Sequence, residues 1–251
     1  MTRRLRRDCP WDRQQTTRTI VPHTVEEAYE VADAAAAGDP AKLLDELGDL
    51  LFQVYFLSLL LEEQGHGGLE AVACGVHAKL VRRHPHVFGT ETISTAGAVR
   101  PRWEAIKSEQ EGREGIFHDV PQSLPALLHA RKAQRRAVAV GFEYPDLDGA
   151  RADLADELRE LDLELARAGE PAAETEPDPR VEAEAGDVLF AAVNVLRRLN
   201  VDPELALRGA TARFVARVEA ADRLAQQEGR EFAKLPLDEQ DRYFDLAKET
   251  E

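Results

Sequence analysis

The chain has 251 residues, 43% of them hydrophobic and 31% charged, and its formal net charge is −15. This length suits one large domain or two small ones, and the acidic balance argues against non-specific binding of DNA or RNA, which relies on basic surface. The two cysteines belong to no C-x-x-C pair and the longest apolar stretch, residues 57–61, is far too short to span a bilayer, so we expect a cytoplasmic protein without disulfides and with neither a membrane nor a nucleic-acid partner.

Helices are predicted along the whole chain, because apolar residues recur at helical spacing and Gly or Pro follows most of the runs. In the first half the predicted helices cover residues 26–37, 41–64, 69–84, 102–110 and 125–140, and residues 112–121 connect the halves. In the second half they cover residues 153–168, 181–199, 204–227 and 237–251, with a Pro- and Glu-rich linker over residues 170–179. No segment alternates convincingly between polar and apolar residues, so no strand is predicted. The fold class is therefore all-α.

Two acidic motifs occur in each half, in the same order. E-x-x-E lies on one predicted helix, and E-x-G-D followed by an apolar run lies on the next. Four carboxylates that converge from two paired helices repel one another unless a cation lies among them. The repeat predicts two tandem helical domains, residues 1–110 and 151–251, joined by a helical segment over residues 111–150. The first quartet is Glu27, Glu30, Glu46 and Asp49, and the second is Glu157, Glu160, Glu184 and Asp187.

The position of these acids on their helices favours a metal site. E-x-x-E alone is typical of a solvated helix face. At about 100° per residue, however, Glu46 and Asp49 border the apolar stripe of their helix, and the acids of the second E-x-G-D motif do the same. Carboxylates at the edge of a core need partners, and all-oxygen ligation selects Mg²⁺ or Mn²⁺. A close helix–helix approach would explain the glycine before each Asp, Gly48 and Gly186.

Two further blocks repeat after the acids. GVHAKLVRR (75–83) aligns with GATARFVAR (209–217), and RWEAIK (102–107) aligns with YFDLAK (243–248). The two cations of each basic pair are four residues apart, so they share one helical face. Such a pair can neutralise phosphate oxygens and an aromatic ring can stack on a base, although a solvated basic edge and core packing explain these residues as well. The matched residues are Lys79 with Arg213, Arg83 with Arg217, and Trp103 with Phe244.

Taken together, these segments resemble the MazG family of nucleoside triphosphate pyrophosphohydrolases. The resemblance implies an all-α fold in which each copy contributes to a four-helix bundle completed by a homodimer. It also implies Mg²⁺-dependent hydrolysis of NTP and dNTP to the nucleoside monophosphate and pyrophosphate, with broad base tolerance and a role in house-cleaning of the nucleotide pool. The segments that carry it are CPWDRQQT (9–16), EEAYEVADA (26–34), ELGDLLFQV (46–54), KLVRRHPHVFG (79–89), RWEAIK (102–107), SLPALLHARKAQRRA (123–137), VGFEY (140–144) and EAGDVLFAAVN (184–194).

The resemblance implies roles for single residues. The acids match the family's metal ligands, and the basic pairs match its contacts to the triphosphate. Trp103 and Phe244 stand where an aromatic ring meets the base. Within the quartets, Glu30 or Glu160 is the candidate that orients or deprotonates the attacking water.

The two copies follow the family pattern unequally. The resemblance implies that the C-terminal copy carries the activity, as in other two-copy members of the family. Here the family's A-N-E-K-F is ATARF (210–214), in which Lys→Arg keeps the charge but changes the geometry and the amide of the Asn is lost. The first copy keeps Lys79, Arg83 and Trp103. The sequence therefore leaves open which copy turns over substrate.

Two other functions fit the same residues. One is a nucleotide-binding or regulatory dimer module that binds metal and nucleotide without turnover. The other is a pyrophosphohydrolase that is narrow for one nucleotide, such as dUTP or phosphoribosyl-ATP. Product release from a panel of nucleotides separates the three.

Overall fold

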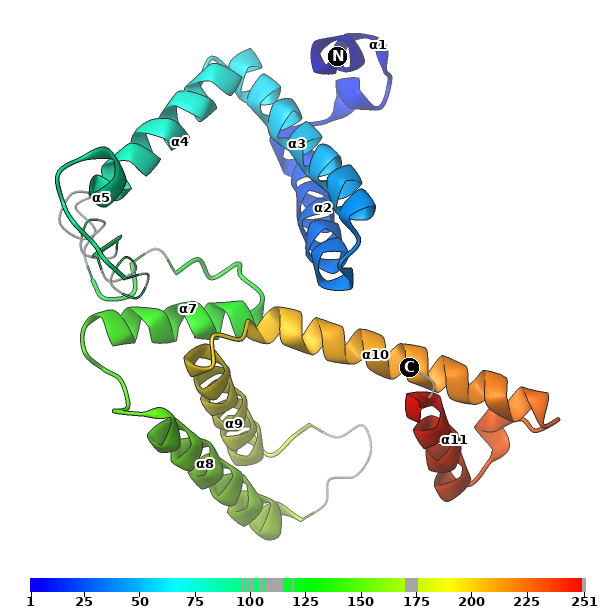
Figure 1. Cartoon of the computed structure of the whole chain (residues 1–251). Helices are drawn as coiled ribbons and strands as arrows, with labels where there is room; N and C mark the ends of the chain where they lie inside the picture. Colours follow the sequence, from blue (N-terminus) through cyan, green and yellow to red (C-terminus); the bar gives the residue numbers. More distant parts are fainter. Residues whose placement is uncertain are drawn as a thin grey trace. The chain divides into compact units, whose positions relative to one another are not determined.

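The computed structural model describes residues 1–95, 97, 99, 102–103, 106, 115–118, 120–169 and 176–249. The chain divides into two compact units, Met1–Glu114 and Gly115–Glu251 (Figure 1). The described residues form helices and no strand, which confirms the all-α prediction. Most of the predicted helix over residues 102–110, and much of the segments 112–121 and 170–179, lie outside the described residues. No helix in the described part of the chain combines the length and the apolarity needed to cross a membrane.

The first unit is organised around a helical hairpin. Gly38 lies between α2 and α3 and has a φ of 67°, a conformation that glycine adopts without steric cost, and it lets the chain reverse. Phe56 and Leu60 of α3 are buried against Ile20 of α2 and form the core of the hairpin. By contrast, α4 buries no residue. The helices are α1 (Thr2–Asp8), η1 (Asp12–Gln14), α2 (Thr17–Ala37), α3 (Pro40–Glu63), α4 (Leu69–Arg83) and α5 (Pro85–Phe88).

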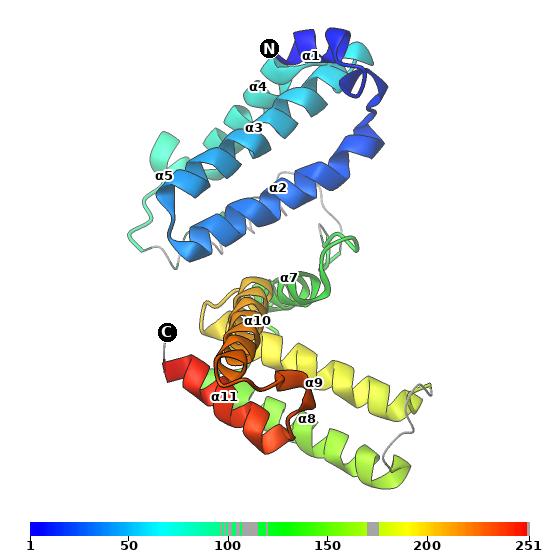
Figure 2. The same cartoon turned by 90° about the vertical axis from the view of Figure 1, so that its right-hand side faces the viewer.

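The second unit contains the equivalent hairpin, made of α8 and α9 (Figure 2). Helix α7 packs against α9, and α10 packs against both α7 and α11. The contact between α10 and α11 has its own core, formed by Ala221, Ala225 and Tyr243. The helices are α7 (Ala126–Ala139), α8 (Leu147–Ala168), α9 (Pro179–Arg198), α10 (Pro203–Gln227), η2 (Phe232–Lys234) and α11 (Leu237–Glu249).

Two helices begin more than a full turn earlier than predicted. Helix α2 begins at Thr17 instead of residue 26, because Thr16 and Thr19 cap it reciprocally: each backbone N–H donates to the other side chain. Pro22 is accommodated inside the helix. Helix α8 begins at Leu147 instead of residue 153, where the side chain of Asp146 accepts from the backbone N–H of Gly149. The earlier starts add a turn or more before each E-x-x-E motif.

Candidate metal centres and an adjacent cavity

The first quartet gathers between α2 and α3. One carboxylate oxygen from each of Glu27, Glu46 and Asp49 lies within 4.8 Å of the others. Glu30 completes the group through a side-chain hydrogen bond with Glu46. Glu46 is only 8% exposed, and Gln53 donates a hydrogen bond to Glu27. All four acids predicted for the first copy therefore meet in one place.

Electrostatic strain accompanies this convergence. Burial raises the pKa of Glu46, and the hydrogen bond with Glu30 and the charge of Glu30 raise it further, while Lys42 opposes the shift. Burial also raises the pKa of Glu27, followed by repulsion from Asp49 and Glu30, against the effect of its hydrogen bond with Gln53. Each shift shows that the charged form is disfavoured in the absence of a cation.

Three acids of the second quartet gather in the same way between α8 and α9, and the fourth, Glu160, is near enough for its charge to repel that of Glu157. One carboxylate oxygen from each of Glu157, Glu184 and Asp187 lies within 4.8 Å of the others. Burial raises the pKa of Glu157, and repulsion from Asp187, Glu160, Asp153 and Glu184 adds to it in that order. Asp153 is a fifth acid that sequence reasoning missed. Its position four residues before Glu157, one helical turn away, is a signal that could have found it.

Both groups fit a hard divalent cation. Mg²⁺ binds oxygen ligands at about 2.0–2.1 Å, so two ligands on opposite sides of the ion are about 4.2 Å apart. The oxygens of each group all lie within 4.8 Å of one another, so they can surround such an ion. Neither group contains a nitrogen or sulfur ligand, a donor set that suits Mg²⁺ or Mn²⁺. Within the described residues, a Cβ built on Gly48 or Gly186 meets no atom within 4 Å. The prediction of a close helix–helix approach at these glycines is therefore wrong within one chain.

The basic and aromatic residues lie on other helices than the acids. Lys79 and Arg83 are on α4, and Arg213 and Arg217 are on α10. The ring of Trp103 packs edge-on against His84, with centroids 4.8 Å apart. In the second unit, the Phe244 ring packs against Phe214 at 5.8 Å, with the Lys248 ammonium 4.8 Å from its centroid. The helical hairpins thus assemble the acids, and the triphosphate and base contacts assigned to these other residues stay predictions.

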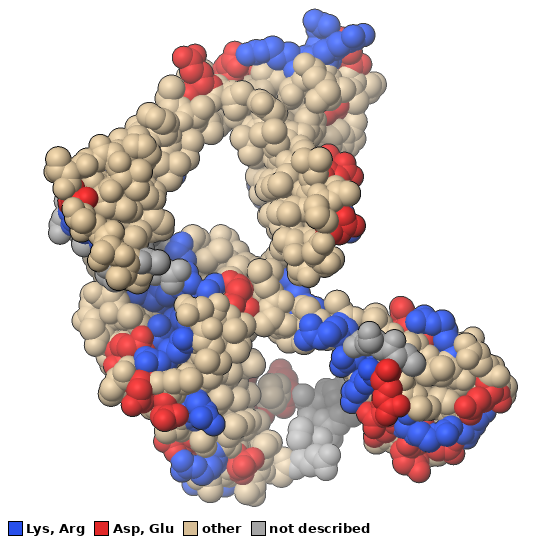
Figure 3. All heavy atoms as spheres, viewed as in Figure 1, with Lys and Arg blue, Asp and Glu red and all other residues tan. Residues whose placement is uncertain are grey.

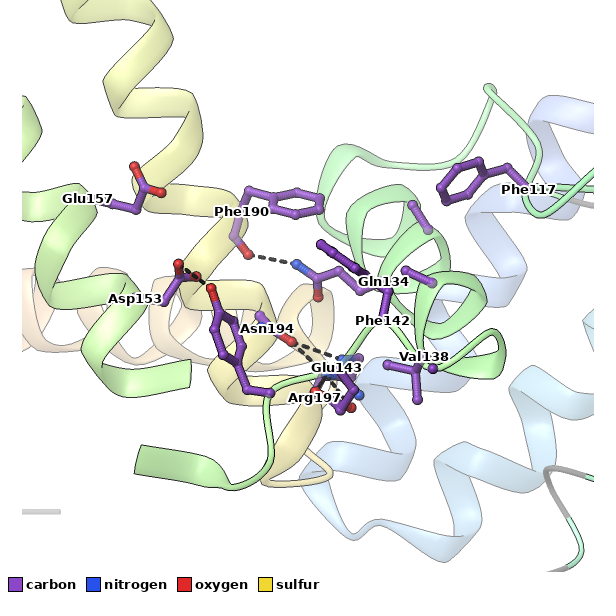
Figure 4. Close-up of a pocket in the computed structure, with 14 residues that line it drawn as sticks. Phe117, Gln134, Val138, Phe142, Glu143, Asp153, Glu157, Phe190, Asn194 and Arg197 are labelled. Atoms are coloured by element: carbon purple, nitrogen blue, oxygen red, sulfur yellow. Dashed lines mark hydrogen bonds and ion pairs between the residues drawn. The ribbon is translucent and has the colours of Figure 1, made fainter. Parts of the chain in front are cut away.

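A cavity of about 740 Å³ adjoins the second quartet, and Glu157 lines both (Figure 4). The Tyr144 hydroxyl donates to Asp153 at 2.6 Å across its wall. The pKa of Tyr144 is raised, first by this hydrogen bond and then by burial and by the charges of Asp153 and Glu157. Sequence reasoning did not find this cavity, because its lining comes from α7, α8, α9, the segment between α7 and α8, and Phe117, which precedes α7.

The raised pKa of Glu46 predicts how stability changes with pH. Because folding raises this pKa, the folded state holds the proton more tightly, and Glu46 makes the metal-free fold less stable as pH rises through the folded value. We expect Glu46→Gln to be more stable than the parent chain at pH 7.5 in EDTA, and the difference to shrink as pH falls. Urea unfolding at several pH values measures this. Saturating Mg²⁺ is the control, since it should stabilise the parent more than the variant; a parent that is the more stable in EDTA at pH 7.5 contradicts the prediction.

Comparison with known proteins finds relatives that match nearly the whole chain. Residues 15–88 match the family model of the MazG nucleotide pyrophosphohydrolase domain. The nucleoside triphosphate pyrophosphohydrolase of Escherichia coli (strain K12) is 37% identical over 246 residues, which cover 97% of this chain and 91% of that protein. The nucleoside triphosphate pyrophosphohydrolase/pyrophosphatase MazG of Thermotoga maritima is 37% identical over 243 residues, 96% of this chain and 89% of that protein. The nucleoside triphosphate pyrophosphohydrolase of Mycobacterium tuberculosis is 35% identical over 144 residues, 57% of this chain and 44% of that protein.

Proposed function

The chain belongs to the MazG family of nucleotide pyrophosphohydrolases, and on this premise we propose that it hydrolyses nucleoside triphosphates to the monophosphate and pyrophosphate with Mg²⁺ and with broad base tolerance. The observation that carries the proposal is the convergence of carboxylate oxygens in both hairpins. The names of the relatives that match along nearly their full length support the reaction type. Clearing aberrant nucleotides from the cytoplasmic pool is the role that suits such an activity.

The proposed mechanism uses residues of the chain as follows. When bound, Mg²⁺ neutralises phosphate oxygens and makes water more acidic. Glu30 or Glu160 orients the attacking water toward the α-phosphorus and takes its proton. Attack at this phosphorus breaks its bond to the bridging oxygen, so the monophosphate and pyrophosphate separate. The basic pairs on α4 and α10 hold the triphosphate and stabilise its negative charge.

A homodimer is part of the proposal, because apolar helix faces are exposed in the described part of the chain. Leu69, Val72, Val76 and Leu80 form a stripe along α4, and each is at least 40% exposed. In Figure 3 the visible face of α4 is almost free of charged side chains. Leu44, Leu47 and Leu51 make a similar exposed stripe on α3. Large exposed apolar patches are typical of interaction surfaces, and the helices of a second copy are the partner that a four-helix bundle requires.

Pyrophosphate release tests the proposed reaction. With Mg²⁺ we expect release from ATP, GTP, CTP, UTP and the deoxynucleotides at comparable rates, loss of activity in excess EDTA, and recovery with Mg²⁺ or Mn²⁺. A coupled pyrophosphatase assay measures the rate, and chromatography identifies the monophosphate. Turnover of a single nucleotide supports the narrow enzyme instead. Thermal stabilisation by nucleotides without any product supports the binding module and excludes hydrolysis.

A further inference from the structure

The cavity beside the second quartet has the character of a pocket for a small planar ligand. Its volume of about 740 Å³ lies within the usual range of about 300–1,000 Å³ for small-molecule sites. The aromatic rings of Phe117, Phe142 and Phe190 line it, together with Gln134 and, at the end near the acids, Glu157. We propose that this cavity receives the base of the nucleotide and that the side-chain oxygen of Gln134 accepts a hydrogen bond from it. This inference rests on the proposed function, because it takes the substrate to be a nucleotide.

Gln134 presents a buried acceptor without a partner at the wall of the cavity. Its residue is only 6% exposed, and its Nε2 donates to the backbone carbonyl of Phe190 at 2.8 Å. A carbonyl can only accept, so the amide nitrogen must face Phe190 and the orientation of the side chain is fixed. The other end, Oε1, is buried and has no hydrogen-bond partner. A buried acceptor without a partner is costly, and an N–H group of a bound ligand would satisfy it.

Apart from Glu157 at the acidic end, the other polar side chains of the wall already have partners. Arg197 donates to Glu143 at 2.7 Å and to Asn194 at 2.6 Å, and Tyr144 donates to Asp153. Figure 4 shows these pairs bonded to one another around the cavity, with the Phe190 ring beside Gln134. They define the shape of the wall, and Gln134 Oε1 remains the acceptor with which a ligand can pair.

The position of Phe190 links the cavity to the metal centre. Phe190 follows Asp187 by three residues on α9, so the two side chains lie on one face of the helix about one turn apart. A base stacked on Phe190, which is 48% exposed, would therefore leave its phosphates near the carboxylates. Aromatic stacking accepts any base, because every base has a π-face.

A single acceptor explains broad base tolerance in chemical terms. Adenine and cytosine carry an exocyclic amine on their pairing edge, and guanine, uracil and thymine carry a ring N–H there, so each can donate to Gln134 Oε1. Unsubstituted purine has neither group. A nucleotide with a purine base lacking the amine should therefore gain nothing from Gln134. The base contact that the resemblance implies for Phe244 stays a separate prediction, and this ring is partly buried against the core of α10 and α11.

The decisive experiment removes the acceptor from the protein and, separately, the hydrogen-bond donor from the base. Binding of the α,β-methylene analogues of ATP and of purine riboside triphosphate is measured by calorimetry, with Mg²⁺, for the full chain and for Gln134→Leu. One hydrogen bond contributes about 0.5–1.5 kcal/mol, which predicts a loss of about two- to thirteenfold for the ATP analogue and no change for the purine analogue. Competition by inorganic tripolyphosphate, which has no base, should be the same for both chains. Phe190→Leu should weaken both base-containing ligands, whereas Phe52→Leu, the same change at the matching position of the first copy, should not.

The outcomes separate this inference from the proposed function. Equal losses for both analogues, or an altered affinity for tripolyphosphate, would mean that Gln134 shapes the site without contacting the base and would overturn the inference. Unchanged binding of the ATP analogue would overturn it too. A failed proposed function is a different result: the parent chain would release no pyrophosphate from any triphosphate, while the binding comparison would still decide whether Gln134 contacts a base.

Discussion

The double variant Glu30→Gln with Glu160→Gln is expected to release pyrophosphate about 10²- to 10⁴-fold more slowly than the parent chain, the range typical of removing a general base. Each substitution keeps the size of the side chain and removes the carboxylate that would orient and deprotonate water. Glu30 and Glu160 are both exposed members of their quartets, so neither change buries a polar group without a partner. Initial rates with saturating ATP and Mg²⁺ measure the effect.

The single variants show which copy works. Loss with Glu160→Gln alone would make the first copy structural, and loss with Glu30→Gln alone would make the second copy structural. Equal partial losses would indicate two working sites. Glu26→Gln is the matched control, because Glu26 is adjacent to Glu27 but outside the quartet and pairs with His23. A fully active double variant would contradict the role assigned to both carboxylates.

A second large effect is expected from Val76→Asp, which places a charge in the middle of the exposed apolar stripe of α4. If a second copy covers this stripe, the buried charge has no partner and the dimer dissociates. Light scattering coupled to gel filtration should then show a monomer in place of a dimer. We expect activity to fall with it, because the basic pairs and the acids lie on different helices and a dimer is proposed to bring them together.

Ala78→Asp is the control for this change. Ala78 is also exposed on α4 and lies about 180° around the helix from the stripe. It should leave the mass and the activity unchanged. A parent chain that is monomeric, or a Val76→Asp variant that remains a fully active dimer, would contradict the proposed interface.

The local structure was largely predictable because its signals are local. The E-x-G-D motif and the apolar spacing after it predicted α3 to within a residue at each end, since Asp39 and Pro40 form a helix start that can be seen in the sequence. The predicted start of α2 at residue 26 lies inside the observed helix, because the cap at Thr16 sets the boundary and Pro22 is accommodated within the helix. A proline can lie inside a helix when the packing on either side outweighs its cost.

The candidate site was predictable only in part. The acids within each quartet could be paired because the E-x-G-D motif borders the apolar stripe of its helix, the side on which the neighbouring helix packs. The cavity could not be predicted, because Gln134, Tyr144 and Phe190 come from segments that meet only after α7 packs on α9. Gln134 in the sequence is one polar residue of a basic helix. Its importance depends on burial and on the carbonyl it faces, and neither is encoded in the local pattern.

The short connection between α2 and α3 has a kinetic consequence. Only Gly38 and Asp39 separate the two helices, so the contacts of this hairpin join residues close in the sequence, a condition under which folding is fast. Association of two chains is a second-order process. After dilution from denaturant, helical circular dichroism should therefore return at a rate independent of protein concentration, while enzymatic activity should return faster in more concentrated samples.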